Sequence, residues 1–228
     1  MKMYGATDIG LVRATNQDNF YIDKDAKWAV VADGMGGHNG GETASSMAVE
    51  EIKKSMQQGV GLKESVNNAN AVVYKAAVET PGLMGMGTTV VLCEIVGSTA
   101  NIVHVGDSRA YIYSNGELKQ VTKDHSIVQQ LIDSGTITEE QAKYHPQRNL
   151  ITRAVGTEKY VLADGVSVDV SSGDYILICS DGLSSYVDES EITDILANTK
   201  LNGVVSKLIE AANNSGGKDN VTVVVIKA

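Results

Sequence analysis

The stretch that decides the fold is Val30-Val31-Ala32-Asp33-Gly34-Met35-Gly36-Gly37-His38. It continues an apolar run from Trp28 that is long enough for a buried β-strand, and Asp33 stands where this strand would leave the core. The glycines that follow allow backbone conformations closed to other residues and let a ligand come close to the main chain. Taken alone, the pattern is most typical of a tight strand-to-helix turn with an aspartate cap.

The same construction recurs downstream, which favours a metal site. An apolar run ends in Asp181-Gly182, another ends close to Asp107, and Asp219 directly precedes the last apolar run. Strand ends of stacked sheets can meet at one edge, and a cluster of carboxylates without cations would cost on the order of several kcal/mol in repulsion and raised pKa values. Oxygen ligands, without His or Cys at metal-binding spacing, favour Mg²⁺ or Mn²⁺ over Zn²⁺.

Hydrophobic periodicity predicts many hairpin-linked strands with helices inserted in pairs. Hairpin signals stand at Gly97-Ser98 and Asn115-Gly116. The predicted strands are 2–7, 20–23, 28–32, 87–96, 99–105, 110–113, 117–121, 174–179 and 221–226, with one or two more in 160–170. The predicted helices are 44–56, 62–76, 126–133, 138–143, 190–196 and 201–212, and the polar segment 144–156 is expected to be a mobile surface flap.

The arrangement predicts an α+β fold. It would be a β-sandwich of two mainly antiparallel sheets flanked by pairs of α-helices, in four αββα layers, rather than a parallel doubly wound sheet. The sequence has no linker, low-complexity tract or composition break, so residues 1–228 are expected to form a single domain.

Composition excludes several classes of function. The net charge is −9, from 28 acidic and 19 basic residues, which argues against a nucleic-acid binder. Cys93 and Cys179 lie far apart in apolar runs and are read as buried free thiols, consistent with a reducing cytoplasm. No signal-peptide pattern and no run of transmembrane length occurs. We expect a cytoplasmic protein, monomeric by default, with neither nucleic acid nor membrane as partner.

An ordered set of motifs covers essentially the whole chain. In order, they are Arg13-x-x-Asn-Gln-Asp18, Asp33-Gly-Met-Gly-Gly-His38, Gly87-Thr-Thr89, Gly106-Asp-Ser-Arg109, Asp124-His-Ser126, Arg153-Ala-Val-Gly156, Ser180-Asp-Gly-Leu183 and Asp219-Asn-Val-Thr222. With these motifs the sequence resembles the metal-dependent type-2C protein serine/threonine phosphatases (the PPM family), most of all their compact bacterial members.

The resemblance implies a two-metal hydrolase that uses Mn²⁺ or Mg²⁺. A metal-bridging hydroxide would attack the phosphorus of phosphoserine or phosphothreonine directly, without a covalent phosphoenzyme. The implied metal ligands are Asp33 as the bridge, the Gly34 carbonyl, Asp181, Asp219, and Asp18 through water. Bacterial relatives often show a third metal, and the matching ligands for it are Asp107 and Asp181.

The resemblance also assigns Arg13 to the substrate phosphate, because a guanidinium forms paired hydrogen bonds with phosphate oxygens. His38 is either the general acid for the leaving oxygen or a residue that shapes the loop or donates to a water, and these alternatives stay open. His125 is expected to cap the helix that follows it. Arg109 and Arg153 are expected to form structural ion pairs.

The leading hypothesis is therefore a cytoplasmic Mn²⁺/Mg²⁺-dependent phosphoprotein phosphatase. The resemblance implies phosphorylated proteins as substrates, and a serine/threonine kinase and its targets as natural partners. Two alternatives are a related phosphatase dedicated to one regulatory partner and an inactive phosphopeptide-binding module. Retention of Arg13, Asp33, Asp181 and Asp219 together speaks against the inactive module.

Overall fold

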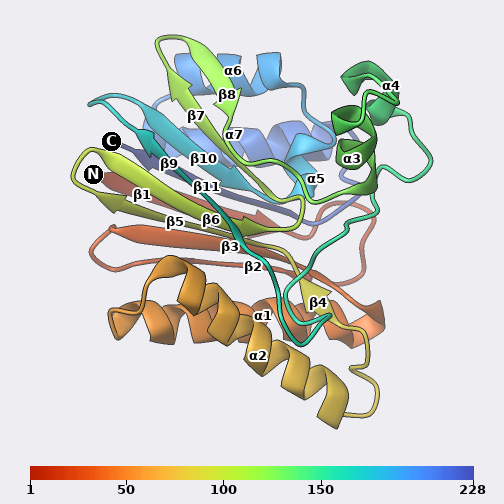
Figure 1. Cartoon of the computed structure of the whole chain (residues 1–228). Helices are drawn as coiled ribbons and strands as arrows, with labels where there is room; N and C mark the ends of the chain where they lie inside the picture. Colours follow the sequence, from red (N-terminus) through yellow and green to blue (C-terminus); the bar gives the residue numbers. More distant parts are fainter.

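The chain folds as two β-sheets packed face to face and covered by helices on both outer sides (Figure 1). The computed structural model describes residues 1–37 and 40–228. The four αββα layers are those that the sequence predicts. His38 lies outside the described residues, so its predicted role stays a prediction.

The first sheet has five strands in the order β1-β11-β10-β7-β8, and all its pairings are antiparallel. Its strands are β1 (Lys2–Asp8), β7 (Arg109–Ser114), β8 (Glu117–Gln120), β10 (Tyr175–Cys179) and β11 (Val221–Lys227). The first and last strands of the chain are neighbours, because Lys2 pairs with Lys227. Figure 1 accordingly shows the two termini side by side.

The second sheet has the order β2-β3-β5-β6-β9, with the short strand β4 paired to the end of β3. Its strands are β2 (Asp18–Ile22), β3 (Trp28–Met35), β4 (Gly87–Thr88), β5 (Val90–Val96), β6 (Thr99–Val105) and β9 (Asp164–Asp169). These pairings are also antiparallel.

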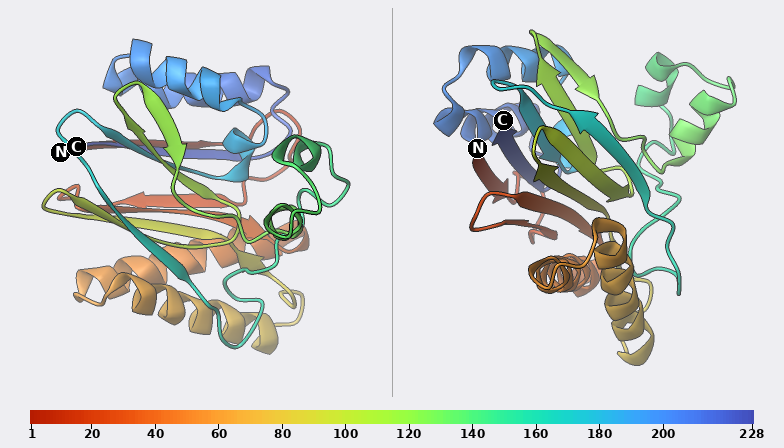
Figure 2. Two further views of the ribbon diagram at one scale, coloured as in Figure 1. Left: turned by 45° about the horizontal axis from the view of Figure 1, so that its top comes forward. Right: turned by 60° about the vertical axis from the view of Figure 1, so that its left-hand side comes forward.

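The helices form the outer layers, as Figures 1 and 2 show. Helices α1 (Gly37–Gln57) and α2 (Leu62–Glu79) cover the second sheet, while α6 (Glu189–Asn198) and α7 (Leu201–Asn214) cover the first. The three short helices are α3 (Ile127–Asp133), α4 (Glu139–Lys143) and α5 (Asp181–Ser184). Ser126 caps α3 by accepting the N–H of Gln129, so the expectation that His125 caps this helix is wrong.

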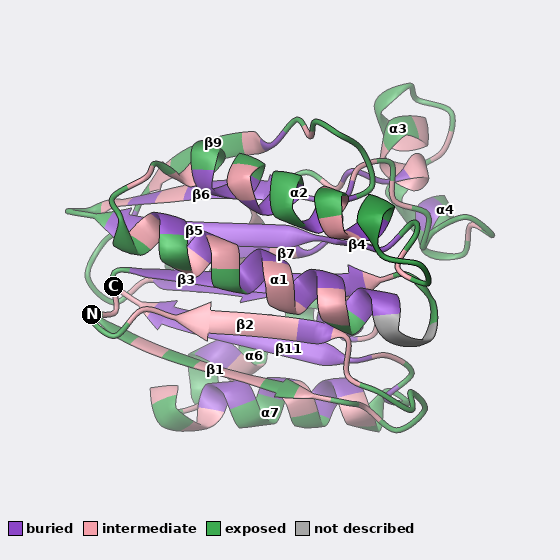
Figure 3. Ribbon diagram, turned by 90° about the horizontal axis from the view of Figure 1, so that it is seen from below, coloured by how far each residue is buried: buried purple, intermediate pink, exposed green. Residues whose placement is uncertain are grey.

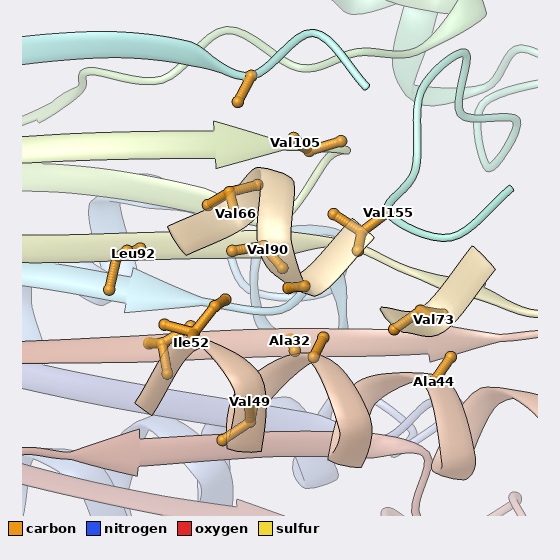
Figure 4. Close-up of a cluster of buried hydrophobic side chains, with 14 of the residues drawn as sticks. Ala32, Ala44, Val49, Ile52, Val66, Val73, Val90, Leu92, Val105 and Val155 are labelled. Atoms are coloured by element: carbon orange, nitrogen blue, oxygen red, sulfur yellow. The ribbon is translucent and has the colours of Figure 1, made fainter. Parts of the chain in front are cut away.

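Three apolar clusters hold the layers together. Because side chains alternate along a strand, Val30 faces α1 and α2 whereas Val31 faces the other sheet. The α1–α2 cluster includes Ile52 and Val66 (Figure 4), and the cluster on the opposite side joins α6 and α7 to the first sheet. Figure 3 shows β3 and β5 buried along most of their length. The sheets are therefore fixed relative to each other by core packing.

Some boundaries differ from the sequence prediction. Strand β3 does not end at Asp33 but continues to Met35, because Asp33 pairs with Asp18, and Gly34 and Met35 pair with β4. The predicted strand 87–96 is interrupted at Thr89, and the one in 160–170 is confined to β9. Apolar periodicity indicated the buried part of each strand. Where a strand ends depends instead on which neighbouring strand its backbone groups pair with.

Candidate active site

Four carboxylates and one guanidinium from separate parts of the chain line a single cavity of about 560 Å³. Asp33 comes from β3, Asp107 from the turn between β6 and β7, Asp181 from the start of α5, and Asp219 from the residue pair before β11. Arg13 belongs to the loop between β1 and β2. The packed sheets bring these residues together at one edge, although they are remote in sequence.

Asp18 joins the two sheets next to this cavity. It starts β2 directly opposite Asp33, and its Oδ2 accepts a hydrogen bond from the Ser180 hydroxyl at 2.7 Å. The Ser180 hydroxyl in turn accepts the N–H of Thr222 at 2.9 Å. Oδ1 of Asp18 is buried and has no hydrogen-bond partner among residues 1–37 and 40–228. An unsatisfied buried carboxylate oxygen is costly unless water or a cation completes it.

The Gly87-Thr-Thr89 motif fixes the backbone of Asp33. The Thr88 hydroxyl and the Thr89 N–H both donate to the Asp33 carbonyl, each at 2.8 Å. The Thr89 hydroxyl accepts the Asp33 N–H at 3.0 Å and lies 2.6 Å from the hydroxyl of Ser108. The sequence contained this motif, but only the pairing of β4 with β3 shows which residue it supports.

The glycines between residues 34 and 37 are required for two different structural reasons. Gly36 and Gly37 adopt φ values of 130° and 68°, in the region that favours glycine. Gly34 needs space instead, because a Cβ there would stand 2.0 Å from the carbonyl oxygen of Gly41 in α1. Glycine is therefore required at position 34 because α1 packs closely on β3. The expectation that Gly34 adopts a special backbone conformation is wrong. Gly34 also lines the cavity.

The carboxylates hold their protons unusually strongly. Burial raises the pKa of Asp33 well above its usual value, and the charges of Asp18, Asp181, Asp107 and Asp219 add to this effect. Burial, followed by neighbouring carboxylates, raises the pKa of Asp181 to about 6, that of Asp18 to about 7 and that of Asp107 to about 8. Such a cluster stores electrostatic repulsion that divalent cations would relieve.

The donor set fits the metals that the sequence predicts. Its charged donors are carboxylate oxygens, which suit Mg²⁺ and Mn²⁺. The buried, unpartnered Oδ1 of Asp18 adds one more acceptor next to the cluster. Arg13 supplies the opposite charge at the cavity wall, where its Nη2 donates to Oδ2 of Asp219 at 2.6 Å and its side chain is 52% exposed. A phosphate group entering the cavity would meet this guanidinium.

Residues of the segment 144–156 complete the cavity wall. Asn149 and Ile151 line it. The C-terminal half of the segment is attached to the rest of the fold at two points. Ile151 forms a β-bridge with Ser126, and Val155 forms one with Thr88. The sequence predicts a mobile surface flap here, which stays a prediction. It does not indicate the contact with the cavity, since the polar segment carries no periodic signal.

A second group of possible metal ligands, His104, His125 and Asp164, lies away from the cavity lining. The Gly106 N–H donates to Nδ1 of His125 at 3.1 Å, so a neutral ring carries its proton on Nε2, 3.0 Å from Asp164. Arg153 also pairs with Asp164, at 3.2 Å. These bonds link His125, Asp164 and Arg153 into a network, whereas Nδ1 of His104 has no hydrogen-bond partner among the described residues.

The other predicted ion pair is present as well. Arg109 donates from Nε and Nη2 to the carboxylate of Asp124, with the shortest bond 2.7 Å long. His104 is buried and stacks on His125, with ring centroids 4.7 Å apart, as expected for a packed histidine. These residues support the turn that carries Asp107.

Comparison with known proteins agrees with the site. A family model described as "Protein phosphatase 2C" matches residues 12–220. The serine/threonine phosphatase stp of Listeria welshimeri serovar 6b is 37% identical over 235 residues, which cover 97% of this chain and 93% of that protein. The serine/threonine protein phosphatase PstP of Mycobacterium tuberculosis is 40% identical over 225 residues, which cover 96% of this chain and 43% of the relative.

Solved structures show the same likeness. The crystal structure of Mycobacterium tuberculosis PstP/Ppp has a TM-score of 0.91 and 38% identity, and the match covers 98% of this chain and 97% of that one. The catalytic domain of PstP in complex with 2 manganese ions has a TM-score of 0.89 and 37% identity, with 98% and 96% covered. The chain therefore belongs to the protein phosphatase 2C family of metal-dependent serine/threonine phosphatases.

Proposed function

We propose that Asp33, Asp181 and Asp219 hold the two divalent cations, Mn²⁺ or Mg²⁺, with which this phosphatase hydrolyses phosphoserine and phosphothreonine esters on proteins. The observation that carries the proposal is the convergence of these carboxylates, from β3, α5 and the start of β11, on one cavity that Arg13 also lines. Asp33 is the proposed bridging ligand, since the other acids of the cluster surround it and raise its pKa.

Further ligands follow from the same arrangement. The Gly34 carbonyl is proposed for the cation next to Asp33, and Asp18 for an interaction through water. Asp107, together with Asp181, is proposed for a third cation. When bound, the cations would acidify water near neutral pH and neutralise developing charge on the phosphoryl oxygens.

Arg13 is the proposed phosphate-binding residue. Its planar guanidinium can donate two parallel hydrogen bonds to phosphate oxygens and hold the ester in one orientation. As a fixed positive charge, it would stabilise the phosphoryl oxygens more strongly as their charge develops. His38 remains a candidate proton donor for the leaving oxygen, with loop shaping as the alternative.

Substrate class and setting are proposed from the family. The relatives are protein phosphatases, so phosphoproteins are the substrates, and we propose that these include a serine/threonine kinase and its targets. Residues 1–228 are proposed to act as one catalytic domain and as a monomer. Within residues 1–37 and 40–228, no helix is long and apolar enough to cross a membrane. Cys93 and Cys179 are buried free thiols, which supports a proposed cytoplasmic setting.

Phosphate release from a phosphothreonine peptide tests the proposal. Release should require Mn²⁺ or Mg²⁺, stop with excess chelator, and fall by at least about 100-fold in Asp33→Asn and Asp181→Asn. A matched control is Asp25→Asn, since Asp25 lies exposed in the β2–β3 turn. Peptide binding without any metal-dependent release would favour an inactive binding module instead.

A further inference from the structure

We propose that Asn220 is a positioning residue that holds the Arg13 loop at a fixed position relative to the carboxylate cluster. The Arg13 loop is residues 9–17, which connect β1 to β2. Asn220 thereby determines where the guanidinium of Arg13 meets the substrate phosphate. The inference rests on the proposed function, because it assigns a role in the same site.

The side chain of Asn220 ties together three points of the Arg13 loop. Its Nδ2 donates to the carbonyl oxygens of Ile9 and Thr15, each at 3.0 Å. Its Oδ1 accepts the N–H of Gln17 at 2.8 Å. Asn220 is only 5% exposed, so these bonds are shielded from water. One side chain thus uses both donors and its acceptor to hold the first residue, the last residue and Thr15 of the loop.

The main chain of Asn220 contacts the residues on the side of the carboxylate cluster, Asp219 and Gly182. Its N–H donates to Oδ1 of Asp219 at 2.9 Å, while Arg13 donates to Oδ2 of the same carboxylate. The carbonyl oxygen of Asn220 packs against Gly182, where a Cβ would stand 1.9 Å away. Asn220 is therefore held between the segment that begins with Asp181 and the loop that carries Arg13.

The Arg13 loop needs such an anchor. Residues 11–15 are exposed, and holding an exposed backbone in one conformation costs conformational entropy. Glycine at position 10 lets the loop come close to Asp219, because a Cβ there would stand 2.3 Å from the Asp219 carbonyl oxygen. Without the Asn220 amide, Arg13 would sample positions displaced from the phosphate, and a shift of about 1 Å in a catalytic arrangement can cost about 100-fold in rate.

Asn70 offers a matched control with the same bonding pattern elsewhere. Its Nδ2 donates to the carbonyl oxygens of Glu158 and Lys159, at 3.1 and 3.2 Å, and its Oδ1 accepts the Gly156 N–H at 2.8 Å. It is 2% exposed. Asn70→Ala should therefore destabilise the fold about as much as Asn220→Ala, without touching the Arg13 loop.

The test combines phosphate binding with turnover in the Mn²⁺-loaded protein. Inorganic phosphate binding is measured by calorimetry, and kcat and KM are measured with an aryl phosphate. Asn220→Ala should weaken phosphate binding by about 10-fold or more, close to the effect of Arg13→Ala, and lower kcat/KM by about 10–100-fold. In the double variant the loss should match that of Arg13→Ala alone within about twofold, because both changes remove one interaction. Asn70→Ala should affect both values far less than Asn220→Ala, because Asn70 bonds to the end of the segment 144–156 and not to the Arg13 loop.

Different outcomes would overturn the inference. Phosphate binding as in wild type, with only a lower unfolding temperature, would make Asn220 merely structural. Weakened Mn²⁺ binding with unchanged phosphate binding would mean that Asn220 acts through Asp219 and not through Arg13. Should Asn220→Ala fail to fold, Asn220→Asp keeps the shape and the acceptor for Gln17 but loses both donors; wild-type phosphate binding in that variant would also overturn the inference.

Failure of the proposed function would look different. In that case the wild-type protein itself would release no phosphate from the aryl ester in the presence of Mn²⁺. The calorimetric comparison of Asn220→Ala, Arg13→Ala and Asn70→Ala would still report on whether Asn220 positions Arg13.

Discussion

Asp18 lies directly opposite Asp33 across the antiparallel pair of β2 and β3. Opposite residues of such a pair extend from the same face of the sheet, so two like charges become neighbours. Elsewhere in a sheet this would simply be destabilising. Here burial raises the pKa of Asp33, and Asp18, Asp181, Asp107 and Asp219 raise it further by adding negative charge to the same region. The fold thus maintains a repulsive cluster that the Arg13 guanidinium offsets at Asp219 and that bound cations or protons would relieve further.

Removing one of these charges should stabilise the metal-free protein. Asp33→Asn eliminates the most crowded carboxylate while keeping its shape, so the free energy of unfolding in chelator at pH 8 should rise by about 1–3 kcal/mol. Urea unfolding measures this quantity, and Asp25→Asn serves as the surface control. A loss of stability in Asp33→Asn would show that the carboxylate supports the fold instead of straining it.

The stability of the metal-free protein should fall as pH rises from about 4 to about 8 and should level off above that range. Asp18 and Asp107, with pKa values of about 7 and about 8, still hold protons in the folded state in this range, whereas the unfolded chain has released them. Because the folded state binds more protons than the unfolded chain in this range, raising the pH shifts the equilibrium toward the unfolded chain. Thermal unfolding in chelator should show this decline, and saturating Mn²⁺ should abolish it. A flat profile in chelator would contradict the raised pKa values.

His104 should make a separate contribution at acid pH. Burial, then the charge of His125, lowers its pKa to about 4, and its Nδ1 is buried without a hydrogen-bond partner in the part of the chain that the structure describes. Between about pH 6.5 and 4 the unfolded chain binds a proton that the folded chain refuses, so His104 reduces stability as pH falls. His104→Phe keeps an aromatic ring beside His125. The stability of this variant relative to wild type should therefore rise by about 2–3 kcal/mol over that range. A difference that does not change with pH would argue against this assignment.

Gly34 should tolerate no side chain. A Cβ would stand 2.0 Å from the Gly41 carbonyl oxygen and 2.6 Å from that of Gln17, both in the backbone. Gly34→Ala should cost about 2–4 kcal/mol in the free energy of unfolding, since α1 must move away from β3. Gly203→Ala in α7 is the control, because its Cβ would meet only the Thr199 side chain at 3.3 Å. Helix propensity predicts that this control gains up to about 1 kcal/mol.

Asp107→Ala should reduce the rate more than the stability. Asp107 lines the cavity, and burial and the charge of Asp181 raise its pKa, so it contributes repulsion to the metal-free fold. Asp124→Ala is the contrasting variant. It leaves Arg109 without its partner and should cost about 3–5 kcal/mol. If Asp107→Ala unfolds as readily as Asp124→Ala, Asp107 is structural and its proposed role at a third cation is wrong.

Local patterns predicted most elements, because apolar periodicity and hairpin residues act within a few positions. Asn115-Gly116 predicted the turn between β7 and β8, and both strands are found there. Boundaries were less predictable. The end of β3 depends on its pairing with β4, a segment more than fifty positions further along the chain. His125 was assigned to a helix cap because it precedes α3, but its ring bonds instead to Gly106, from a distant turn.

The sequence by itself determined the chemistry of the candidate metal ligands. Asp33, Asp181 and Asp219 each adjoin an apolar strand, and oxygen donors of this kind suit a hard divalent cation wherever the strands meet. Only the tertiary structure decided which atoms hold these groups in place. The Thr88 and Thr89 bonds to Asp33, the Ser180 bond to Asp18 and the Asn220 bonds to the Arg13 loop all join segments remote in sequence. Such contacts leave no periodic pattern in the sequence, because they arise from the packing of the two sheets and not from local backbone preferences.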